Sequence, residues 1–375
     1  MKRFLKYSLF LLNLIFALAL AICRLVPMAS PYEYSFLALL GIFTPVLFVV
    51  NSIFFFLWLF NRKWLYILVP AVALLMAWPV VRVCFSFHPQ REPVSVEENK
   101  SFRVLSYNVR LLDLYHWSGR EDTRKKMLEF FRTKNADVLC LQEFYTGSEK
   151  NTTRNLEAIR RVCGYEYQAE CNMYVSRRGK WGSVLFSHFP ILNTSNIEID
   201  MNGNNLLQKA DLQIGTDTVS VFNVHLKSNK LSKAETEMMQ HAEVPSWTDS
   251  NLKYSRSILA KLQDNATNRA LEADIVFNTV SMSRYPTLVC GDFNDLPCSY
   301  VYFRIRGQLQ DAFLEKGMGL GNTYRSRWPF FRIDYLFHHP KIKLLQFETL
   351  QVPWSDHNPV IATFQKNNPH SVSAP

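Results

Sequence analysis

Three long apolar segments occupy the first quarter of the chain. They span residues 7–26, 36–60 and 64–84, and each holds at most one charged residue. A helix needs about 20 apolar residues to cross a bilayer core of roughly 30 Å, so each segment is long enough to span a membrane. The pattern predicts a membrane anchor of three transmembrane helices within residues 1–86.

The first segment also has features of a secretory signal peptide. Lys2, Arg3 and Lys6 precede it, and Met28-Ala29-Ser30 follow it. Its apolar stretch is longer than the core of a signal peptide, and two further apolar segments come after it. These features favour a retained anchor.

The positions of Lys and Arg indicate how the anchor is oriented. Basic residues lie before the first segment and, as Arg62-Lys63, in the short turn between the second and third. Arg24 and Arg82 lie near the opposite ends, so the bias is moderate. Basic residues favour the cytoplasmic side, which places the N-terminus inside and residues 87–375 outside. In a bacterium this describes an inner-membrane protein whose larger part is periplasmic.

After residue 86 the hydrophobic pattern changes. Residues 87–101 are mostly polar and read as a linker, and residues 367–375 read as a disordered tail. Between them lie short apolar runs typical of buried strands, at 102–109, 138–143, 184–187, 206–214, 218–226, 287–290, 332–337 and 360–364.

Helical spacing is confined to a few stretches of this second part. It occurs at 122–134 and 153–163, and an amphipathic helical pattern covers much of 229–280. Strands outnumber helices, and many strands are joined by turns of hairpin length. This favours one α+β domain over residues 102–366, built as a two-sheet sandwich with helices outside rather than as a doubly wound parallel sheet.

Charge and cysteine content add little to this picture. The net charge is +10, but residues 1–100 hold 9 Lys and Arg against 4 Asp and Glu, which leaves +5 for the rest. That excess suits an anionic substrate or a membrane surface, and an ordinary solvated surface explains it equally well. Cys163 and Cys171 are spaced so that they could pair in an oxidising compartment, and no Cys/His zinc spacing occurs.

Polar clusters lie at or near the ends of the expected strands. They are Asn108, Gln142-Glu143, Asn223-Val224-His225, Gly291-Asp292-Phe293-Asn294, Arg332-Ile333-Asp334-Tyr335 and Ser355-Asp356-His357. Acids hold a hard divalent cation, His and Asn bind phosphate oxygens, and one Asp is left to activate water. The set is typical of a site that hydrolyses phosphoesters.

Single clusters are weaker signals than the set. Asp292 and Asn294 are two residues apart, so on an extended backbone they point the same way, but an Asx-rich turn alone also explains them. Asp356 beside His357 places a carboxylate next to an imidazole. Asp334 is a carboxylate that could hold an imidazole in one tautomer.

The six clusters, in this order, resemble the endonuclease/exonuclease/phosphatase superfamily, which includes deoxyribonucleases, apurinic-site endonucleases and neutral sphingomyelinases. The resemblance covers residues 102–365. It implies a four-layer α/β/β/α sandwich of two mixed, mostly antiparallel sheets. It also implies a divalent cation, Mg²⁺ or Mn²⁺, as cofactor.

The resemblance implies roles for individual residues. Asp292 and Asn294 match the pair that activates water, and Asp334 is similar to the carboxylate that partners His357. The implied metal ligands are Glu143, Asn108 and Asp356, and the implied phosphate-binding residues are Asn108, His225, Asn294 and His357. His225, His357 and Asp334 complete the implied catalytic set.

The substrate is open at this level. The anchor and its orientation favour a phospholipid headgroup or another extracytoplasmic phosphoester. A membrane-tethered nuclease acting on DNA or RNA is the alternative, with little support from a net +5 and no long Lys/Arg run. A binding module on an inactive scaffold is the third hypothesis, and the presence of Glu143, Asp292 and His357 argues against it.

The orientation of the anchor can be tested directly. A reporter enzyme that is active only outside the cytoplasm, fused after Ser101, should be active, because Lys and Arg placement puts this residue on the outer side. A cytoplasm-only reporter at the same position is the control. Strong signal from that second fusion would reverse the orientation.

Overall fold

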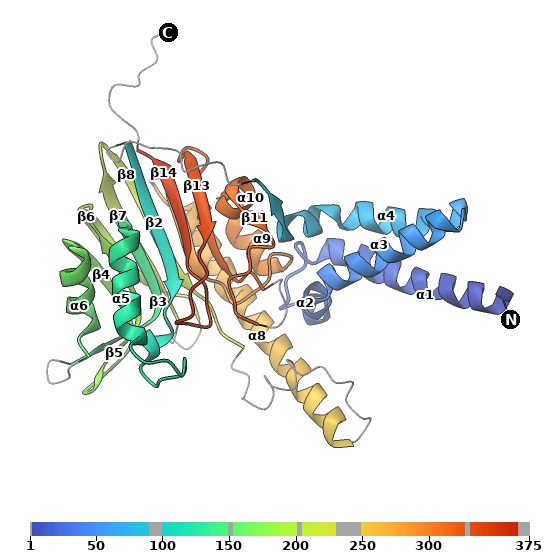
Figure 1. Cartoon of the computed structure of the whole chain (residues 1–375), viewed down its shortest axis with the longest axis horizontal. Helices are drawn as coiled ribbons and strands as arrows, with labels where there is room; N and C mark the ends of the chain where they lie inside the picture. Colours follow the sequence, from blue (N-terminus) through green and yellow to red (C-terminus); the bar gives the residue numbers. More distant parts are fainter. Residues whose placement is uncertain are drawn as a thin grey trace, which may run out of the picture. The chain divides into compact units, whose positions relative to one another are not determined.

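The computed structural model describes residues 2–89, 100–148, 153–200, 205–229, 249–326 and 331–366. Most of the expected linker and the whole expected tail lie outside these residues. The chain divides into two compact units (Figure 1). The helical unit comprises residues 1–85, 228–270 and 295–304, and the sandwich unit comprises residues 86–227, 271–294 and 305–375.

The helical unit contains the apolar segments. Its helices are α1 (Lys2–Ile22), α2 (Ser35–Ile42), α3 (Thr44–Phe60) and α4 (Trp64–Val81), with 3-10 turns η1 (Cys23–Leu25) and η2 (Arg82–Cys84). Two unbroken stretches, Phe4–Leu25 and Trp64–Cys84, are long and apolar enough to cross a membrane. A third crossing exists if α2 and α3 together form one span.

The middle apolar segment is bent. The axes of α2 and α3 differ by 58°, which describes either a broken span or a re-entrant loop. Pro45 stands in the first turn of α3, where it has no backbone N–H to continue the hydrogen bonds of α2. Residues 36–60 are apolar almost throughout, so hydropathy alone predicts one straight helix there and not a break.

Buried polar side chains join the helices of this unit. Trp58 Nε1 donates to Asn13 Oδ1 at 3.0 Å, and Asn51 Nδ2 donates to the Phe16 carbonyl at 3.0 Å. Such bonds between helices are favourable in an apolar surrounding because each polar group otherwise lacks a partner there. They fix α1 against α3.

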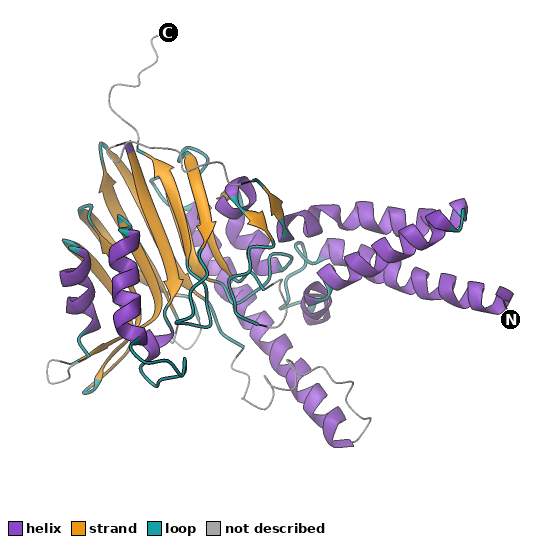
Figure 2. Cartoon of the chain, viewed as in Figure 1, coloured by secondary structure: helices purple, strands orange, loops and turns teal. Residues whose placement is uncertain are grey.

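The sandwich unit is built on two six-stranded sheets. One sheet has the order β13-β14-β2-β3-β5-β4 and the other β10-β12-β9-β8-β7-β6. Their strands are drawn in orange in Figure 2. The strands of the first are β2 (Ser101–Asn108), β3 (Val138–Gly147), β4 (Tyr167–Ser176), β5 (Gly179–Ser187), β13 (Leu344–Thr349) and β14 (Val360–Gln365). Those of the second are β6 (Ile191–Glu198), β7 (Leu206–Ile214), β8 (Asp217–His225), β9 (Thr287–Asp292), β10 (Gln310–Asp311) and β12 (Asp334–His338).

Each sheet has one parallel pair near its centre. β2 pairs with β3 in parallel and β8 pairs with β9 in parallel, whereas the other pairs are antiparallel. A further short pair, β1 (Ser86–Phe87) with β11 (Met318–Gly319), is also antiparallel. The expectation of two mixed, mostly antiparallel sheets is confirmed.

The alternation of side chains along the strands creates two cores. Val104 and Cys140 of the first sheet pack against Val221, Cys290 and Leu336 of the second, so the sheets share one apolar layer. Their neighbours in sequence point the other way, because successive side chains alternate between the faces of a strand. Leu105 and Leu139 therefore belong to the core on the outer face of the first sheet.

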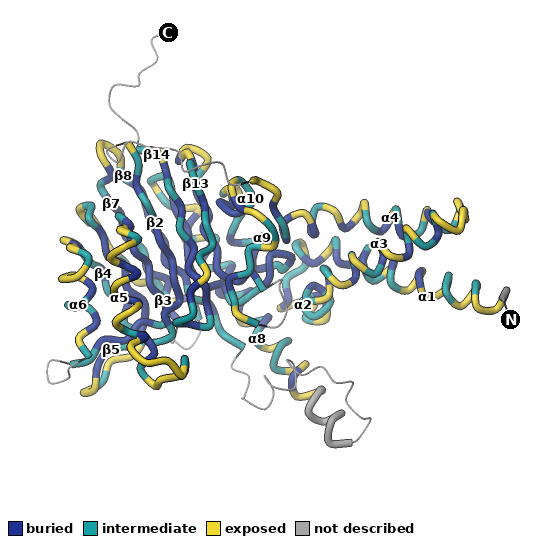
Figure 3. The backbone as a smooth tube through the Cα atoms, in the orientation of Figure 1, coloured by how far each residue is buried: buried dark blue, intermediate teal, exposed yellow. Residues whose placement is uncertain are grey.

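Helices cover the outer faces, and the strands between them are largely buried (Figure 3). α5 (Thr123–Lys134) and α6 (Asn155–Cys163) lie over the first sheet (Figure 1). α10 (Ala312–Lys316) and residues 271–281 of α8 (Asp249–Ser281) belong to the sandwich unit, and α9 (Tyr300–Arg306) enters it at residue 305. Buried Ala273, Val276 and Val280 mark the packed face of α8.

Several details differ from the sequence expectations. β4, β6 and β13 were not expected; β4 and β6 are edge strands with partly exposed faces and no continuous apolar run. Cys163 and Cys171 form no disulfide with each other. Of the expected helical stretch 229–280, the structure describes residue 229 and the residues from 249 onward.

Candidate active site

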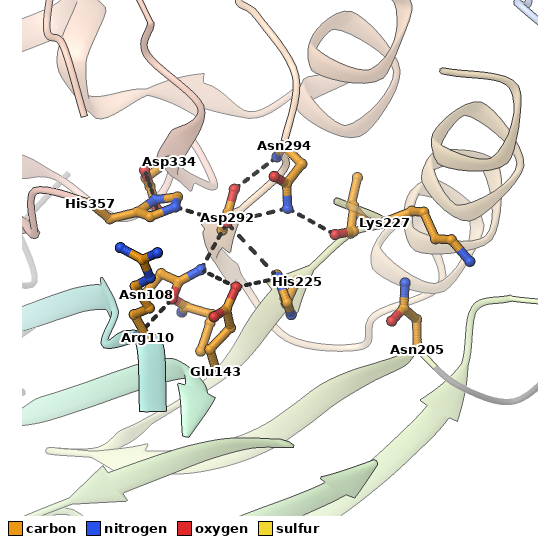
Figure 4. A network of polar contacts seen from close by, with 12 residues as sticks. Asn108, Arg110, Glu143, Asn205, His225, Lys227, Asp292, Asn294, Asp334 and His357 are labelled. Carbon is orange, nitrogen blue, oxygen red and sulfur yellow. Dashed lines mark hydrogen bonds and ion pairs between the residues drawn. The ribbon is translucent and has the colours of Figure 1, made fainter. Parts of the chain in front are cut away.

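The ends of the central strands bring the expected residues together. β2 ends at Asn108, β8 at His225 and β9 at Asp292, and β12 begins at Asp334. The register pairs His225 with Asp292 in the parallel ladder and Asp334 with Asp292 in the antiparallel one. Asn108 and Asp334 are 226 positions apart in sequence, and they lie in the same group of side chains (Figure 4).

Asp292 is the centre of the group. Its side chain is buried, and Oδ2 accepts hydrogen bonds from Asn108 Nδ2 at 3.0 Å and Asn294 Nδ2 at 3.3 Å. Oδ1 accepts from the Asn294 backbone N–H at 2.8 Å. His357 Nε2 and His225 Nε2 lie 3.6 and 3.9 Å from Oδ2. These donors and imidazoles hold the carboxylate in one orientation.

Gly291 allows Asp292 to reach this place. Its φ is +138°, and a Cβ there would meet the Val224 carbonyl oxygen at 1.9 Å. Val224 is its partner in the parallel ladder. Any larger residue would therefore push β9 away from β8 and displace Asp292 from His225.

Glu143 enters the site from the first sheet through an irregularity in β3. The β3–β5 register shifts between Leu141 and Phe144, and Glu143 has a φ of +47°, which is unusual for a residue with a side chain. This turns the carboxylate toward the Asp292 group. Glu143 Oε1 accepts from Asn108 Nδ2 at 3.1 Å and lies 3.7 Å from His225 Nε2. Its side chain is 34% exposed, so the carboxylate faces the open side of the site.

His357 and Asp334 form a buried pair. His357 Nδ1 lies 2.9 and 3.1 Å from the two Asp334 oxygens, so Nδ1–H donates to the carboxylate and Nε2 faces Asp292. Thr323 Oγ1 accepts from the Asp334 backbone N–H, and the Tyr324 ring packs edge-on against His357 at 5.3 Å. The hydrogen bond to Asp334 therefore holds the His357 ring in one orientation.

The charges of this pair follow from their surroundings. Burial lowers the pKa of His357, but the carboxylates of Asp334 and Asp292 outweigh it and raise the pKa to about 10. Burial also raises the pKa of Asp334 to about 6, although His357 opposes this shift. At neutral pH the pair is an imidazolium and a carboxylate, and Nε2–H is available as a donor.

His225 at the end of β8 and Asn294 just after β9 also belong to the site. His225 Nε2 is buried and makes no hydrogen bond within the described part of the chain. Asn294 has a φ of +53° and donates through Nδ2 to the Leu226 carbonyl at 3.0 Å as well as to Asp292. A buried imidazole nitrogen without a partner is suited to an oxygen of a bound anion.

Asp356 lies beside a residue that the sequence analysis did not single out. Its Oδ2 is 3.3 Å from Arg110 Nη1, and the Arg110 backbone N–H donates to Asn108 Oδ1 at 3.1 Å. The neighbouring Ser355 Oγ donates to the Asn108 carbonyl at 2.9 Å. Asp356 is therefore next to Asn108, with its charge partly offset by Arg110. In the sequence, the feature that could have pointed to Arg110 is its position two residues after Asn108.

The donor chemistry suits a hard divalent cation. Asp292, Asp334 and His357 each offer a ligand atom within 4.8 Å of the others, and Glu143 adds a carboxylate close to Asn108. Asp334 and His357 are hydrogen-bonded to each other, whereas the Glu143 carboxylate is partly exposed. Oxygen-rich sets of this kind favour Mg²⁺ or Mn²⁺.

Buried amides join the two sheets directly beneath the site. Gln142 Nε2 donates to Asn223 Oδ1 at 2.7 Å and to Ser106 Oγ at 3.0 Å, and Asn223 Nδ2 donates to Gln208 Oε1 at 2.9 Å. Gln142 precedes Glu143, and Asn223 stands two residues before His225. The sequence placed Gln142 and Asn223 in its clusters without a role; their role is to link the sheets.

Residues 105–357 match the Endonuclease/Exonuclease/phosphatase family. The chain belongs to this family. Residues 3–84 match a second family, described as a Domain of unknown function (DUF8431). The family assignment from the sequence is confirmed.

Individual relatives are distant. Protein angel homolog 2 of Mus musculus is 25% identical over 261 residues, which cover 62% of this chain and 42% of the mouse protein. The chain thus spans less than half of that relative. Solved family structures from Bacteroides thetaiotaomicron and Bacteroides vulgatus have TM-scores of 0.52 and 0.51, each at 15% identity. They cover 72% and 71% of this chain and 98% and 99% of their own chains, and they show the same fold.

Proposed function

We propose that this phosphoester hydrolase uses a divalent cation and a water molecule activated by Asp292. The observation that carries the proposal is the environment of the Asp292 carboxylate. Two asparagine amides donate to it, and two imidazoles lie within 3.9 Å of it. A carboxylate fixed in this way can take a proton from a water molecule placed in line with a phosphorus atom.

The two imidazoles act on the phosphate. Nε2–H of His357, and Nε2–H of His225, which makes no hydrogen bond to the described residues, would donate to phosphate oxygens on which charge develops. Asp334 keeps the His357 ring oriented, and its negative charge balances the positive charge of the imidazolium. Asn294 holds Asp292 and can orient the attacking water.

Glu143 is the residue best placed to hold the cation, with Asn108 and Asp356 beside it. Glu143 is the partly exposed carboxylate of the group, and Asn108 contacts both it and Asp292. When bound, a divalent cation neutralises charge on the phosphate and polarises its oxygens. Because Asp356 is paired with Arg110, we expect it to contribute less to cation binding than Glu143 does.

The apolar helices support a substrate that is reached at a membrane. Phe4–Leu25 and Trp64–Cys84 are each long enough to anchor the chain in a bilayer. With the outward orientation expected from Lys and Arg placement, the proposed substrate is an extracytoplasmic phosphoester. That class contains both lipid headgroups and nucleotide esters.

Hydrolysis should depend on the cation. EDTA should abolish phosphodiester hydrolysis by the full chain, and excess Mg²⁺ or Mn²⁺ should restore it, because oxygen ligands dominate the site. Glu143→Gln should raise the Mg²⁺ concentration needed for half-maximal rate. Full activity in chelator would show that Glu143 does not serve a metal.

Variants should rank by their distance from the reacting atoms. Asp292→Asn should lower kcat by about 10²–10⁴-fold, because it removes the general base. His357→Ala should be comparably damaging, and Asp334→Ala milder, because Asp334 acts through the His357 ring. The measurement is kcat on one phosphodiester in saturating Mg²⁺.

His188→Ala is the matched control. His188 stacks on Tyr165 at a ring distance of 4.5 Å and has no part in the site described above, so its turnover should stay near that of the unchanged chain. Turnover in Asp292→Asn equal to that of this control would refute the role of Asp292.

A further inference from the structure

The loop after β2 has an unusual backbone. Arg110, Leu111, Leu112, Asp113 and His116 all have positive φ, between 43° and 60°, and none of them is glycine. Residues with a Cβ adopt this region rarely, and clusters of such residues persist where the surrounding structure holds them. Such clusters are found at ligand-binding and active sites.

Two buried residues hold the loop in this conformation. Leu112 is 2% exposed and packs in the core under α5. The Asp113 carboxylate is buried and accepts hydrogen bonds from Ser118 N–H at 2.9 Å and Ser118 Oγ–H at 2.5 Å. Ser118 Oγ is also 2.9 Å from Thr123 Oγ1, which ties the loop to the start of α5. The residues between these points form a fixed tip.

The tip consists of three exposed planar side chains. They are Tyr115, His116 and Trp117, and Tyr115 and Trp117 are 59% and 44% exposed. The Tyr115 and Trp117 rings lie 5.1 Å apart, inclined by 48°. Exposed tyrosine and tryptophan side by side offer apolar ring faces that a ligand can cover.

Arg110 connects this tip to the reaction centre. Its guanidinium lies over the Trp117 ring, 4.7 Å from the centroid, and its Nη1 is 3.3 Å from Asp356. Its backbone N–H donates to Asn108 Oδ1. Arg110 therefore contacts both Asn108 of the site and the Trp117 ring of the tip.

We propose that Tyr115 and Trp117, braced by Arg110, form the subsite for the group that the phosphate carries, and that this group is a planar aromatic ring. The proposal rests on the proposed function, because it takes the phosphate at Asn108 and His225 as the fixed end of the substrate. Flat π faces and a guanidinium stack well on planar heteroaromatic rings. An alkyl or polyol headgroup gains no stacking from them.

The test compares two probes that differ only by such a ring. AMP and ribose 5-phosphate are titrated calorimetrically into the full chain in detergent with Mg²⁺, in an Asp292→Asn background that prevents turnover. AMP should bind about ten- to a hundred-fold more tightly than ribose 5-phosphate. Trp117→Ala and Tyr115→Ala should weaken AMP binding toward that of ribose 5-phosphate and leave ribose 5-phosphate unchanged. Trp117→Phe should retain most of the preference.

Tyr285→Ala is the control, because Arg284 and Tyr285 form a similar cation–ring pair just before β9, at the end opposite Asp292. It should leave both affinities unchanged. Equal binding of the two probes, no binding of either, or an equal loss of both in Trp117→Ala would overturn the subsite. Hydrolysis of a phosphodiester by the chain with Asp292 intact is measured separately. Its absence would overturn the proposed function, whatever the probes show.

Discussion

The site depends on a hydrogen-bonded contact between two buried amides. Gln142 from the first sheet donates to Asn223 from the second, with both side chains fully buried. An unpaired amide in such a place costs free energy, so the two sheets are stable at one spacing and one register. Glu143 follows Gln142 directly, and His225 stands two residues after Asn223. The amide contact therefore sets how far the carboxylate of one sheet lies from the imidazole of the other.

Both sheets add strained backbone to this frame. Glu143 of the first sheet and Asn294, which follows β9 of the second, have positive φ and stand at or beside the Asp292 group. These conformations are costly for residues with a Cβ, and the packing of two six-stranded sheets with a shared apolar layer stabilises them. The result is a carboxylate with fixed neighbours, which is what general-base chemistry requires: Asp292 does not have to be reoriented when substrate arrives.

The sequence predicted the parts of this architecture that repeat a simple pattern. Central strands such as β2, β3, β8 and β9 are buried on both faces, so they read as apolar runs followed by polar clusters. Edge strands β4 and β6 have few buried residues and no continuous apolar run, and they were missed. The break between α2 and α3 was hidden in a uniformly apolar segment. The Tyr115–Trp117 tip was missed because the loop that presents it has a left-handed backbone, which the sequence does not reveal where no glycine marks it.

The central claim is that Glu143 and the Asp292 group, brought from two sheets, form one metal-dependent hydrolytic site. The most direct test is the position of a bound cation, seen as an anomalous diffraction peak in crystals of the chain grown with Mn²⁺. The account predicts a peak within bonding distance of a Glu143 carboxylate oxygen, on the side that faces Asp292. A peak bound by Asp334 and His357 with Glu143 uninvolved, or no peak among these residues, would contradict it.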